Sequence, residues 1–448
     1  MATKKDLIEA QGFSRRRLLS AFTSGAPGGK ELDPAKPLRA VAGGIALTAI
    51  VILAGVFYGF MRPGLPSGWE NNTLVLVNDT GARYLSIDET LYPVINTASA
   101  RLLTPSDEFK VVTTDQESIK GITIGPTIGI LGAPDALPTP ESLVNDGWVS
   151  CVVTGTGSDT RIAAKPIAAA SDAGVLVTLD ERLYVVAGQH RYSVNRDGSE
   201  AVLRAVGLAG ESALPVDDQW LNLFEPGEEL RPLRVDGAGD PIQGSDLTVG
   251  TVVHPAGSEI DNRYLITPDG ELARLSPLAF GLYQLGSGAA LGGEREVSPA
   301  DIASLPTSQD VAGGEDWPQA ILAPKTQSDI ACAILERDGT GRAATRFALA
   351  PAGTKIKVGV QVSTGAGSLV ITGGSDVQGG GLAVLIDSSG TAFPVPGADA
   401  EMIARLGYEE AMISRVPGSW LQFLAAGPEL TESAARATPQ LAVSSDDK

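Results

Sequence analysis

The stretch from Ala40 to Met61, AVAGGIALTAIVILAGVFYGFM, decides how the chain is organised. It holds 22 uncharged residues and lies between Arg39 and Arg62. As a helix it would rise about 1.5 Å per residue and span roughly 33 Å, enough to cross the ~30 Å hydrocarbon layer of a bilayer. A charged residue inside it would oppose insertion, and it contains none. We therefore predict a single transmembrane helix over residues 39–62.

Two other interpretations of the apolar stretch are less consistent with the sequence. A cleaved signal peptide has a shorter apolar region close to the N-terminus, whereas this run starts near residue 40 and shows no clear small-residue cleavage site. The segment SRRRLL at residues 14–19 faintly resembles a twin-arginine export signal, but more than twenty residues separate it from the apolar run. A buried helix of a soluble core is also disfavoured, because the run is apolar on every side.

The charges on either side of the apolar stretch predict its orientation. Residues 1–39 carry eight Lys or Arg and four Asp or Glu, a net charge of +4, so the other 409 residues carry −23 of the whole-chain −19. Basic flanks stay in the cytoplasm. We therefore expect a short basic cytoplasmic segment over residues 1–38, with the acidic bulk on the periplasmic side of the inner membrane. Arg15, Arg16 and Arg17 are the candidate docking residues for cytosolic partners or for anionic lipid.

The overall composition excludes several classes of protein. With 43% hydrophobic residues in 448, the bulk of the chain has enough apolar surface to fold. A net charge of −19 leaves no basic face for phosphates, so no nucleic acid is expected as a partner. Two histidines and two cysteines argue against most metal enzymes, and we predict no metal site. The 53 Gly and 29 Pro, with 5% aromatics, favour short strands and turns over long helices.

The two cysteines, Cys151 and Cys332, both fall in the part expected to be exported. In an oxidising compartment two cysteines in one chain are typical of a disulfide. Two buried free thiols are the alternative. Cysteine-based catalysis is less consistent with the sequence, because neither His190 nor His254 lies in a recognisable nucleophile context.

A pattern of two apolar strands joined by a tight polar turn, followed by a helix-like stretch, occurs four times. Asp269-Gly270, in the third copy, is a hairpin turn signal. The spacing of Ala and Leu after each hairpin gives the following helix one apolar face. The unequal gaps between copies exclude a stacked solenoid. The four hairpins occupy Tyr84–Ile95, Leu183–Val194, Tyr264–Leu275 and Ala383–Val395.

These features predict an α+β fold with a single N-terminal transmembrane helix and an elongated exported region. That region would contain a β-rich core domain, which holds both cysteines, and four β-hairpin/helix repeats. Repeats one and four are expected to pair at one end, and repeats two and three at the other. We divide the chain into a cytoplasmic segment at 1–38, a transmembrane helix at 39–62, repeats at 73–110, 173–208, 263–299 and 377–427, core parts at 111–172, 209–262 and 300–376, and a disordered tail at 428–448.

Sequence motifs for catalysis are missing. The nearest approach to a phosphate-binding loop is GAPGGKE, residues 25–31, which lacks the GxxxxGK[ST] spacing and any Ser or Thr after Lys30. No GxSxG and no HExxH occurs. We therefore predict no catalytic residue, no cofactor and no cofactor-binding residue.

Four parts of the sequence carry a resemblance: the N-terminal run from Gln11 to Phe22, Leu38-Arg39, the first repeat at Tyr84–Leu103, and Ile128–Asp135 with Leu137-Pro138. Together they resemble the EccB family, a membrane component of type VII (ESX) secretion systems of mycobacteria and their relatives. The resemblance covers nearly the whole chain. It implies that the Trp-cysteine site at Trp148 and Cys151 has Cys332 as its disulfide partner. In the stretch Ile128–Asp135, Leu131 replaces the proline that is usual in the family.

The resemblance implies a structural subunit that anchors and organises the periplasmic part of a secretion pore. Expected partners are an EccC-type FtsK-like ATPase, the EccD and EccE subunits, a mycosin protease, membrane lipid and further copies of this chain through the exported domains. Peptidoglycan contact would suit the exported repeats. Some family members are labelled ATPases, so ATP would be the cofactor if that label holds. The alternatives are an ATP or nucleotide hydrolase, a wall-acting hydrolase, and a stand-alone cell-wall-binding membrane protein.

Overall fold

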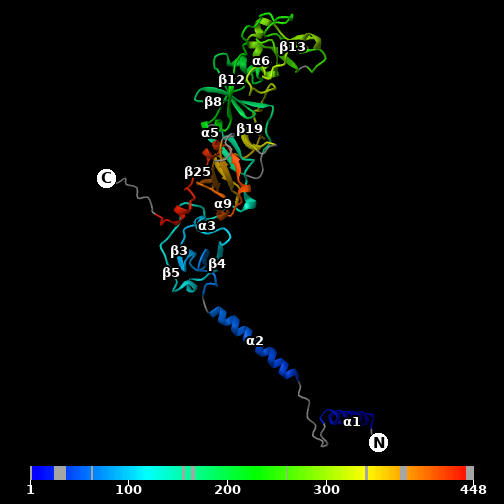
Figure 1. The fold of residues 1–448 in the computed structure, drawn as a ribbon, viewed down its shortest axis with the longest axis vertical. Helices are drawn as coiled ribbons and strands as arrows, with labels where there is room; N and C mark the ends of the chain where they lie inside the picture. The colour runs from blue at the N-terminus through cyan, green and yellow to red at the C-terminus, as the bar shows by residue number, and fades with distance from the viewer. Residues whose placement is uncertain are drawn as a thin grey trace, which may run out of the picture. The chain divides into compact units, whose positions relative to one another are not determined.

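The computed structural model describes residues 3–24, 37–61, 64–153, 157–162, 167–259, 261–338, 342–373 and 381–439 (Figure 1). Contacts divide the chain into two units, residues 1–65 with 117–120, and residues 66–116 with 121–448. The first unit contains two long helices, and the second contains five β-sheets with short helices. The mixed α+β fold with an N-terminal apolar helix is therefore confirmed.

The first unit consists mainly of helix α1 (Lys4–Ser24) and helix α2 (Pro37–Met61). Pro37 suits the first position of a helix, because its missing N–H would have no partner there. Helix α2 contains the whole predicted apolar stretch, and one of its windows, Ala40–Phe57, is long and apolar enough to cross a membrane. Arg62 lies outside the described residues.

The sheet of repeat 1 shows how each repeat is built. Three antiparallel strands are followed by a helix, and the chain then returns parallel to the first strand and again parallel to the third. Asp88 and Glu89 form the tight turn of the hairpin with positive φ angles of 47° and 62°. The elements are β1 (Thr73–Val77), β2 (Arg83–Ile87), β3 (Thr90–Pro93), α3 (Thr97–Leu102), β4 (Lys110–Thr114) and β5 (Thr123–Ile124), in the sheet order β4-β1-β2-β3-β5.

Repeats 2 and 4 follow the same order of strands and helix, and repeat 3 follows it up to the first returning strand. Repeat 2 contains β8 (Ala173–Leu179), β9 (Arg182–Ala187), β10 (His190–Val194), α4 (Ser199–Ala205), β11 (Leu214–Pro215) and β12 (Glu225–Leu230), with β17 (Ala323–Pro324) added beside β8. Repeat 3 contains β13 (Val252–Pro255), β14 (Arg263–Ile266), β15 (Leu272–Leu275), α6 (Pro277–Leu285), α7 (Gly288–Leu291) and β16 (Arg295–Val297), followed by α8 (Pro299–Ile302). Repeat 4 contains β21 (Ser368–Thr372), β22 (Leu382–Ile386), β23 (Thr391–Val395), α9 (Ala400–Leu406), β24 (Ser414–Val416) and β25 (Ala425–Ala426).

The fifth sheet carries both cysteines, and we refer to it as the cysteine sheet. It is built from two distant parts of the chain. In sheet order its strands are β19 (Ala343–Ala350), β18 (Ile330–Arg337), β6 (Val149–Val153), β7 (Gly157–Ile162) and β20 (Gly359–Val362). The remaining short helices are η1 (Gln116–Ile119), η2 (Pro140–Ser142), α5 (Asp218–Leu221), η3 (Glu410–Met412), η4 (Gly418–Phe423) and α10 (Glu432–Arg436).

The strand bounds correct several predicted boundaries. Repeat 3 starts with β13 rather than at residue 263, and repeat 4 starts with β21 rather than at residue 377. Repeat 1 extends past residue 110, because β4 and β5 complete its sheet. Repeat 2 extends past residue 208, because β11 and β12 complete its sheet. The returning strands β4, β5, β11 and β12 escaped the sequence pattern because they are joined through helices or loops to parallel neighbours, and no tight turn marks them.

The structure also corrects which parts of the chain form the core domain. The stretch 209–262 supplies β11 and β12 to repeat 2 and β13 to repeat 3, so it contributes no strand to the cysteine sheet. It contributes instead α5, whose Trp220 and Leu221 are buried in the same apolar cluster as Trp148 and Phe347. The predicted bounds followed the hairpins alone, whereas β11 and β12 return parallel to the strands of repeat 2 and β13 precedes the hairpin of repeat 3.

Two apolar cores join the repeats in pairs. One core combines residues of repeats 1 and 4, such as Leu85 and Leu385, and brings helix α3 against helix α9. Another combines residues of repeats 2 and 3, such as Val185 and Leu265, and brings α4 against α6. Gly281 permits the second contact, because a Cβ there would lie 2.9 Å from the carbonyl oxygen of Ala205. The pairing of one with four and two with three is the arrangement expected from the sequence.

Three repeats share an aromatic ring that packs on a glycine of the returning chain. Added Cβ atoms at Gly125 and Gly227 would lie 2.5 Å from the rings of Tyr92 and Tyr192, respectively. A Cβ at the corresponding glycine of repeat 4 would lie 2.4 Å from the ring of Phe393. Only glycine leaves room for such close approach of the backbone to a ring. The repeats therefore have the same packing although their sequences differ.

The segment after Pro428, predicted to be disordered, is folded over residues 428–439. It contains helix α10, and Leu430 and Ala435 are both fully buried. The helix is only five residues long and depends on these contacts rather than on its own propensity. Its short length and its Ser, Thr and Ala content explain why the sequence pattern missed it. Residues 440–448 lie outside the described residues.

Candidate functional sites: the apolar helix and the disulfide

Helix α2 presents apolar side chains in every direction. Ile45, Leu53 and Phe57 are 66%, 67% and 65% exposed, and no residue in the apolar window is buried. The hydroxyl of Thr48 donates to the carbonyl oxygen of Gly44 at 2.9 Å, so this polar group is satisfied within the helix. Every backbone donor and acceptor within a helix interior is paired, as lipid requires. The surface of α2 is therefore suited to hydrocarbon and not to water.

The three predicted docking arginines lie in the middle of helix α1. Arg15, Arg16 and Arg17 are exposed. Successive helical residues are about 100° apart around the axis, so three in a row spread over more than half of the helix circumference. Leu7, Leu18 and Phe22 are also exposed, at 65%, 65% and 91%. The three positive charges are therefore spread over more than half of the circumference of α1 and do not form one narrow basic face.

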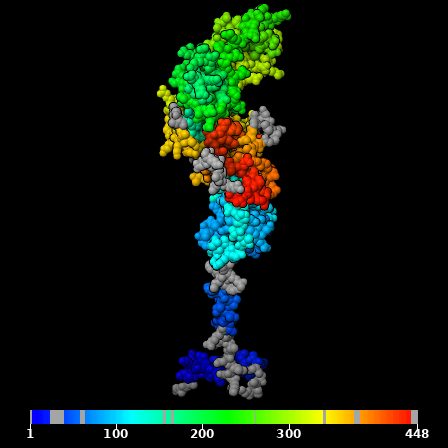
Figure 2. All heavy atoms as spheres, turned by 90° about the vertical axis from the view of Figure 1, so that its left-hand side faces the viewer, coloured from blue at the N-terminus to red at the C-terminus, as the bar shows by residue number. Residues whose placement is uncertain are grey.

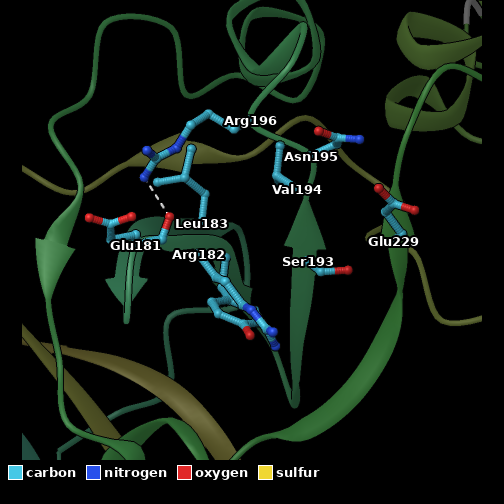
Figure 3. A pocket seen from close by; sticks show the side chains of 9 residues that line it. Glu181, Arg182, Leu183, Ser193, Val194, Asn195, Arg196 and Glu229 are labelled. Carbon is cyan, nitrogen blue, oxygen red and sulfur yellow. Dashed lines mark hydrogen bonds between the residues drawn. The ribbon is translucent and has the colours of Figure 1, made fainter.

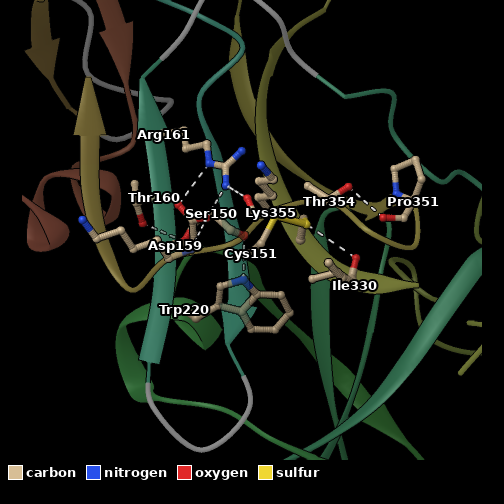
Figure 4. Close-up of a disulfide and its surroundings, with 12 residues drawn as sticks. Ser150, Cys151, Asp159, Thr160, Arg161, Trp220, Ile330, Pro351, Thr354 and Lys355 are labelled. Atoms are coloured by element: carbon tan, nitrogen blue, oxygen red, sulfur yellow. Dashed lines mark hydrogen bonds and ion pairs between the residues drawn. A yellow bond between two sulfur atoms is a disulfide. The ribbon is translucent and has the colours of Figure 1, made fainter. Parts of the chain in front are cut away.

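The disulfide between Cys151 and Cys332 joins neighbouring strands of the cysteine sheet (Figure 4). The two residues lie directly opposite each other on antiparallel β6 and β18, with Cα atoms 4.0 Å apart. Both are buried, at 5% and 0% exposure. The bond connects positions 181 residues apart in sequence. It therefore holds together the two distant chain segments from which the sheet is built.

A buried carboxylate lies on the strand next to this disulfide. Asp159 is opposite Cys151 on β7 and is only 1% exposed. Its oxygens accept hydrogen bonds from Arg161 Nε at 3.1 Å, Gln361 Nε2 at 3.0 Å and the Lys357 backbone N–H at 2.9 Å. Figure 4 shows the Arg161 guanidinium beside this carboxylate. A buried charge is tolerated when it is paired and hydrogen-bonded in this way, so Asp159 ties β20 to β7 rather than serving as a free acid or base.

The stretch GILGAPD, which resembles a family motif, supports the start of helix α3. Asn96 caps the helix by accepting from the Ser99 N–H at 2.9 Å, and its side-chain amide donates to the Ile130 carbonyl at 2.7 Å. The Ile130 N–H in turn donates to the Ser99 hydroxyl at 2.9 Å. Asp135 pairs with Arg83, and the Arg83 guanidinium lowers the pKa of the Asp135 carboxyl. These contacts make the stretch a structural part of repeat 1.

Repeats 1 and 2 each carry a surface hollow at the same place, where the second strand begins and the third ends. The hollow in repeat 2 has a volume of about 320 Å³ and the one in repeat 1 about 300 Å³. In repeat 2 the Arg196 guanidinium donates to the Glu181 carbonyl, as the dashed line in Figure 3 shows. The repeat 2 hollow is lined by Glu181, Arg182, Tyr184, Ser193, Asn195 and Glu229, among others, and the repeat 1 hollow by Arg83, Tyr84, Pro93, Val94, Ile95 and Thr127.

The remaining candidates for chemistry do not converge. His190 Nε2 is 3.9 Å from Glu225 Oε2, and His254 Nδ1 is 3.5 Å from Glu294 Oε1. Neither histidine faces a free thiol, because both cysteines are in the disulfide. Within the described residues, no group of three His, Cys, Asp or Glu side chains could hold a metal ion. The segment GAPGGKE at residues 25–31 lies outside the described residues. Its sequence has no Ser or Thr after Lys30.

An apolar helix with no protein cover, joined to a strand-rich unit of four related repeats, defines a membrane-anchored protein with a large β-rich part. The family model for "Type VII secretion system ESX-1, transport TM domain B" matches residues 1–442. The chain therefore belongs to this family, EccB, and is an inner-membrane protein. The resemblance found in the sequence is thereby confirmed.

Two related proteins match over most of the chain. The ESX-2 secretion system ATPase EccB2 of Mycobacterium tuberculosis is 27% identical, over 97% of this chain and 94% of its own length. The ESX-5 secretion system ATPase EccB5 of the same organism is 29% identical, over 62% of this chain and 58% of its own length.

Solved structures share the fold. A chain of an intact ESX-5 inner membrane complex matches with a TM-score of 0.65 and 22% identity, covering 98% of this chain and 96% of that one. The EccB3 dimer from the ESX-3 core complex matches with a TM-score of 0.64 and 21% identity, covering 82% of this chain and all of that one. The arrangement of sheets described above is therefore that of the EccB fold.

Proposed function

We propose that this chain is a structural subunit of the inner-membrane complex of a type VII secretion system, which anchors and organises the periplasmic part of the pore. The observation that carries the proposal is the uncovered apolar surface of α2, attached to a large folded unit and found in a chain of the EccB family. A helix of this kind fixes a folded domain to a bilayer without any catalytic chemistry.

The proposed orientation places the N-terminus in the cytoplasm and the β-rich unit in the periplasm. Residues 1–39 are net positive, whereas the remainder is strongly acidic. Positive flanks are retained on the cytoplasmic side. The disulfide supports the same orientation, because such bonds persist in oxidising compartments such as the bacterial periplasm.

The proposed partners follow from the relatives. Their solved structures are of an ESX-5 inner membrane complex and of an EccB3 dimer. By analogy with that dimer, copies of this chain would contact one another through their exported units. The family resemblance of the sequence adds EccC, EccD and EccE subunits and a mycosin protease as proposed partners. Exposed positive charge on α1 favours a cytosolic protein partner or anionic lipid.

ATP hydrolysis is the second candidate function, because the related EccB2 and EccB5 proteins carry the name ATPase. Hydrolysis would require groups that bind phosphates and position a water molecule. The segment at 25–31 has no Ser or Thr after Lys30, a residue type that binds magnesium in phosphate loops. We therefore favour the structural role. ATP turnover by the purified chain, lost in a single point variant that still folds, would reverse this preference.

The structural role is tested by deleting residues 2–35 from the chain and purifying the native membrane complex. We expect co-purification of the partner subunits to fall at least tenfold, because the cytoplasmic docking helix is removed while α2 remains. The exported unit should keep its disulfide and its thermal melting, since its sheets and apolar cores are formed by residues from Thr73 onward. An unchanged subunit composition of the purified complex would contradict the docking role of the N-terminal segment.

A further inference from the structure

Residues 428–439, which we name the C-terminal strap, lie where repeats 1 and 4 meet. Figure 2 shows its red atoms beside the cyan atoms of repeat 1 and the orange atoms of repeat 4. The strap leaves β25 at the edge of the repeat 4 sheet, runs in extended form to Thr431, and then forms helix α10. Thr431 caps α10 by accepting a hydrogen bond from the Ala434 N–H at 3.2 Å.

The strap binds repeat 4 through backbone and apolar contacts. The Leu430 N–H donates to the Pro394 carbonyl on β23 at 2.8 Å. The Leu430 side chain is fully buried in the core that also contains Val395, Leu406 and Tyr408. The strap therefore extends the edge of the repeat 4 sheet and inserts one apolar side chain between the two repeats.

The same strap binds repeat 1. Helix α10 contacts helix α3, and Ala435 is fully buried at this contact within the shared core. The carbonyl oxygen of Ala437 accepts a hydrogen bond from the Gly129 N–H at 3.2 Å. Gly129 has a φ of 128°, a conformation that favours glycine, and this conformation directs its N–H toward the strap. The strap thus spans both repeats.

Arg405 connects all three segments at this place. From α9 in repeat 4, its guanidinium donates to the Leu102 carbonyl at the end of α3 and to the Glu432 carboxylate, both at 3.0 Å. Glu432 also accepts from Arg436 at 2.9 Å, and the two arginines lower the pKa of its carboxyl. Glu432 lies in the first turn of α10, where a negative charge is favourable. The junction thus recognises one apolar residue followed by an acidic helical turn.

We propose that the junction of repeats 1 and 4 is a peptide-binding groove, which the chain fills in cis with its own residues 428–439. The ligand class is a short peptide with an extended leucine, a Thr or Ser helix cap and a glutamate directly after the cap. A one-turn helix is not stable by itself, so the strap folds only when it is bound. The strap makes few backbone hydrogen bonds compared with the sheets, so it opens at a lower free-energy cost than they do.

The test uses the chain ending at Gly427, purified in detergent, and a fluorescent peptide of residues 428–439. We expect saturable binding measured by fluorescence anisotropy, and at least tenfold weaker binding to the chain ending at Pro439, whose groove is occupied. A peptide with Leu430→Asp should bind at least tenfold more weakly, and one with Glu432→Gln several-fold more weakly. A Thr438→Asp peptide is the matched control, because Thr438 is exposed. Equal binding of all peptides, or none to a shortened chain that retains its disulfide and circular dichroism, would overturn the proposal.

A second measurement applies if the shortened chain does not fold. In the complete chain, Leu430→Asp should raise amide hydrogen exchange in α3, α9 and α10, while α4 and α6 keep the exchange of the unmodified chain. The Thr438→Asp chain should exchange like the unmodified chain throughout. Unchanged exchange in α3 and α9 of the Leu430→Asp chain would overturn the groove, whatever the outcome for the secretion role.

Discussion

Replacement of Val395 by aspartate is expected to destabilise the paired repeats 1 and 4 by roughly 3–5 kcal/mol. Val395 lies at the end of β23, opposite Ala383, and is fully buried in the core shared by the two repeats. An aspartate there would bring a carboxylate into an apolar cluster. Urea unfolding followed by hydrogen exchange in β22, β23 and α9 measures the loss.

Leu382→Asp is the matched control, because Leu382 is in the neighbouring strand β22 but is 44% exposed. A carboxylate at this position remains in contact with water, so we expect a change of less than about 1 kcal/mol. Equal destabilisation by the two substitutions would show that burial in the shared core is not what stabilises this part of the fold.

Loss of the disulfide has the second large effect. In Cys151→Ala/Cys332→Ala we expect the β-rich unit to lose about 2–5 kcal/mol of stability and to melt at a lower temperature. The entropic model gives about 5 kcal/mol as an upper value for a loop of this size, and the bond closes 181 residues. Differential scanning calorimetry under oxidising conditions measures the shift.

Reduced wild-type chain is the control for this experiment. With both thiols free, its melting temperature should approach that of the double variant, because the two then differ only by buried sulfur atoms. Identical melting of oxidised wild type and double variant would mean that the pairing of β6 with β18, and not the covalent bond, supplies the stability of the cysteine sheet.

The sequence predicted the structure best where a single local property decides which element forms. The stretch from Ala40 to Met61 is uncharged over a length that matches the thickness of a bilayer, and this property alone predicts helix α2. The hairpins of the repeats were visible for a similar reason, since period-2 alternation and turn residues mark adjacent antiparallel strands. The turn at Asp269-Gly270 lies between paired β14 and β15, with Gly270 at a φ of 75°.

Contacts between distant parts of the chain could not be predicted from local patterns. The return strand Thr123–Ile124 has two residues, both exposed, and gives no alternation to recognise. Helix α10 was missed because it packs against helix α3 of repeat 1, which lies more than 300 residues earlier in the chain. Asp159 likewise acquires its partners from β20 and the loop before it, about 200 residues later. In each case the stabilising group is remote in sequence.

The central claim is that α2 crosses the inner membrane and leaves everything after it on the periplasmic side. Protease added to intact spheroplasts tests it directly, with antibodies against residues 4–24 and against the β-rich unit. We predict that the β-rich unit is digested while a membrane-protected fragment containing α1 and α2 survives. Protection of the β-rich unit, under conditions in which a known periplasmic domain is degraded, would contradict both the orientation and the anchoring role.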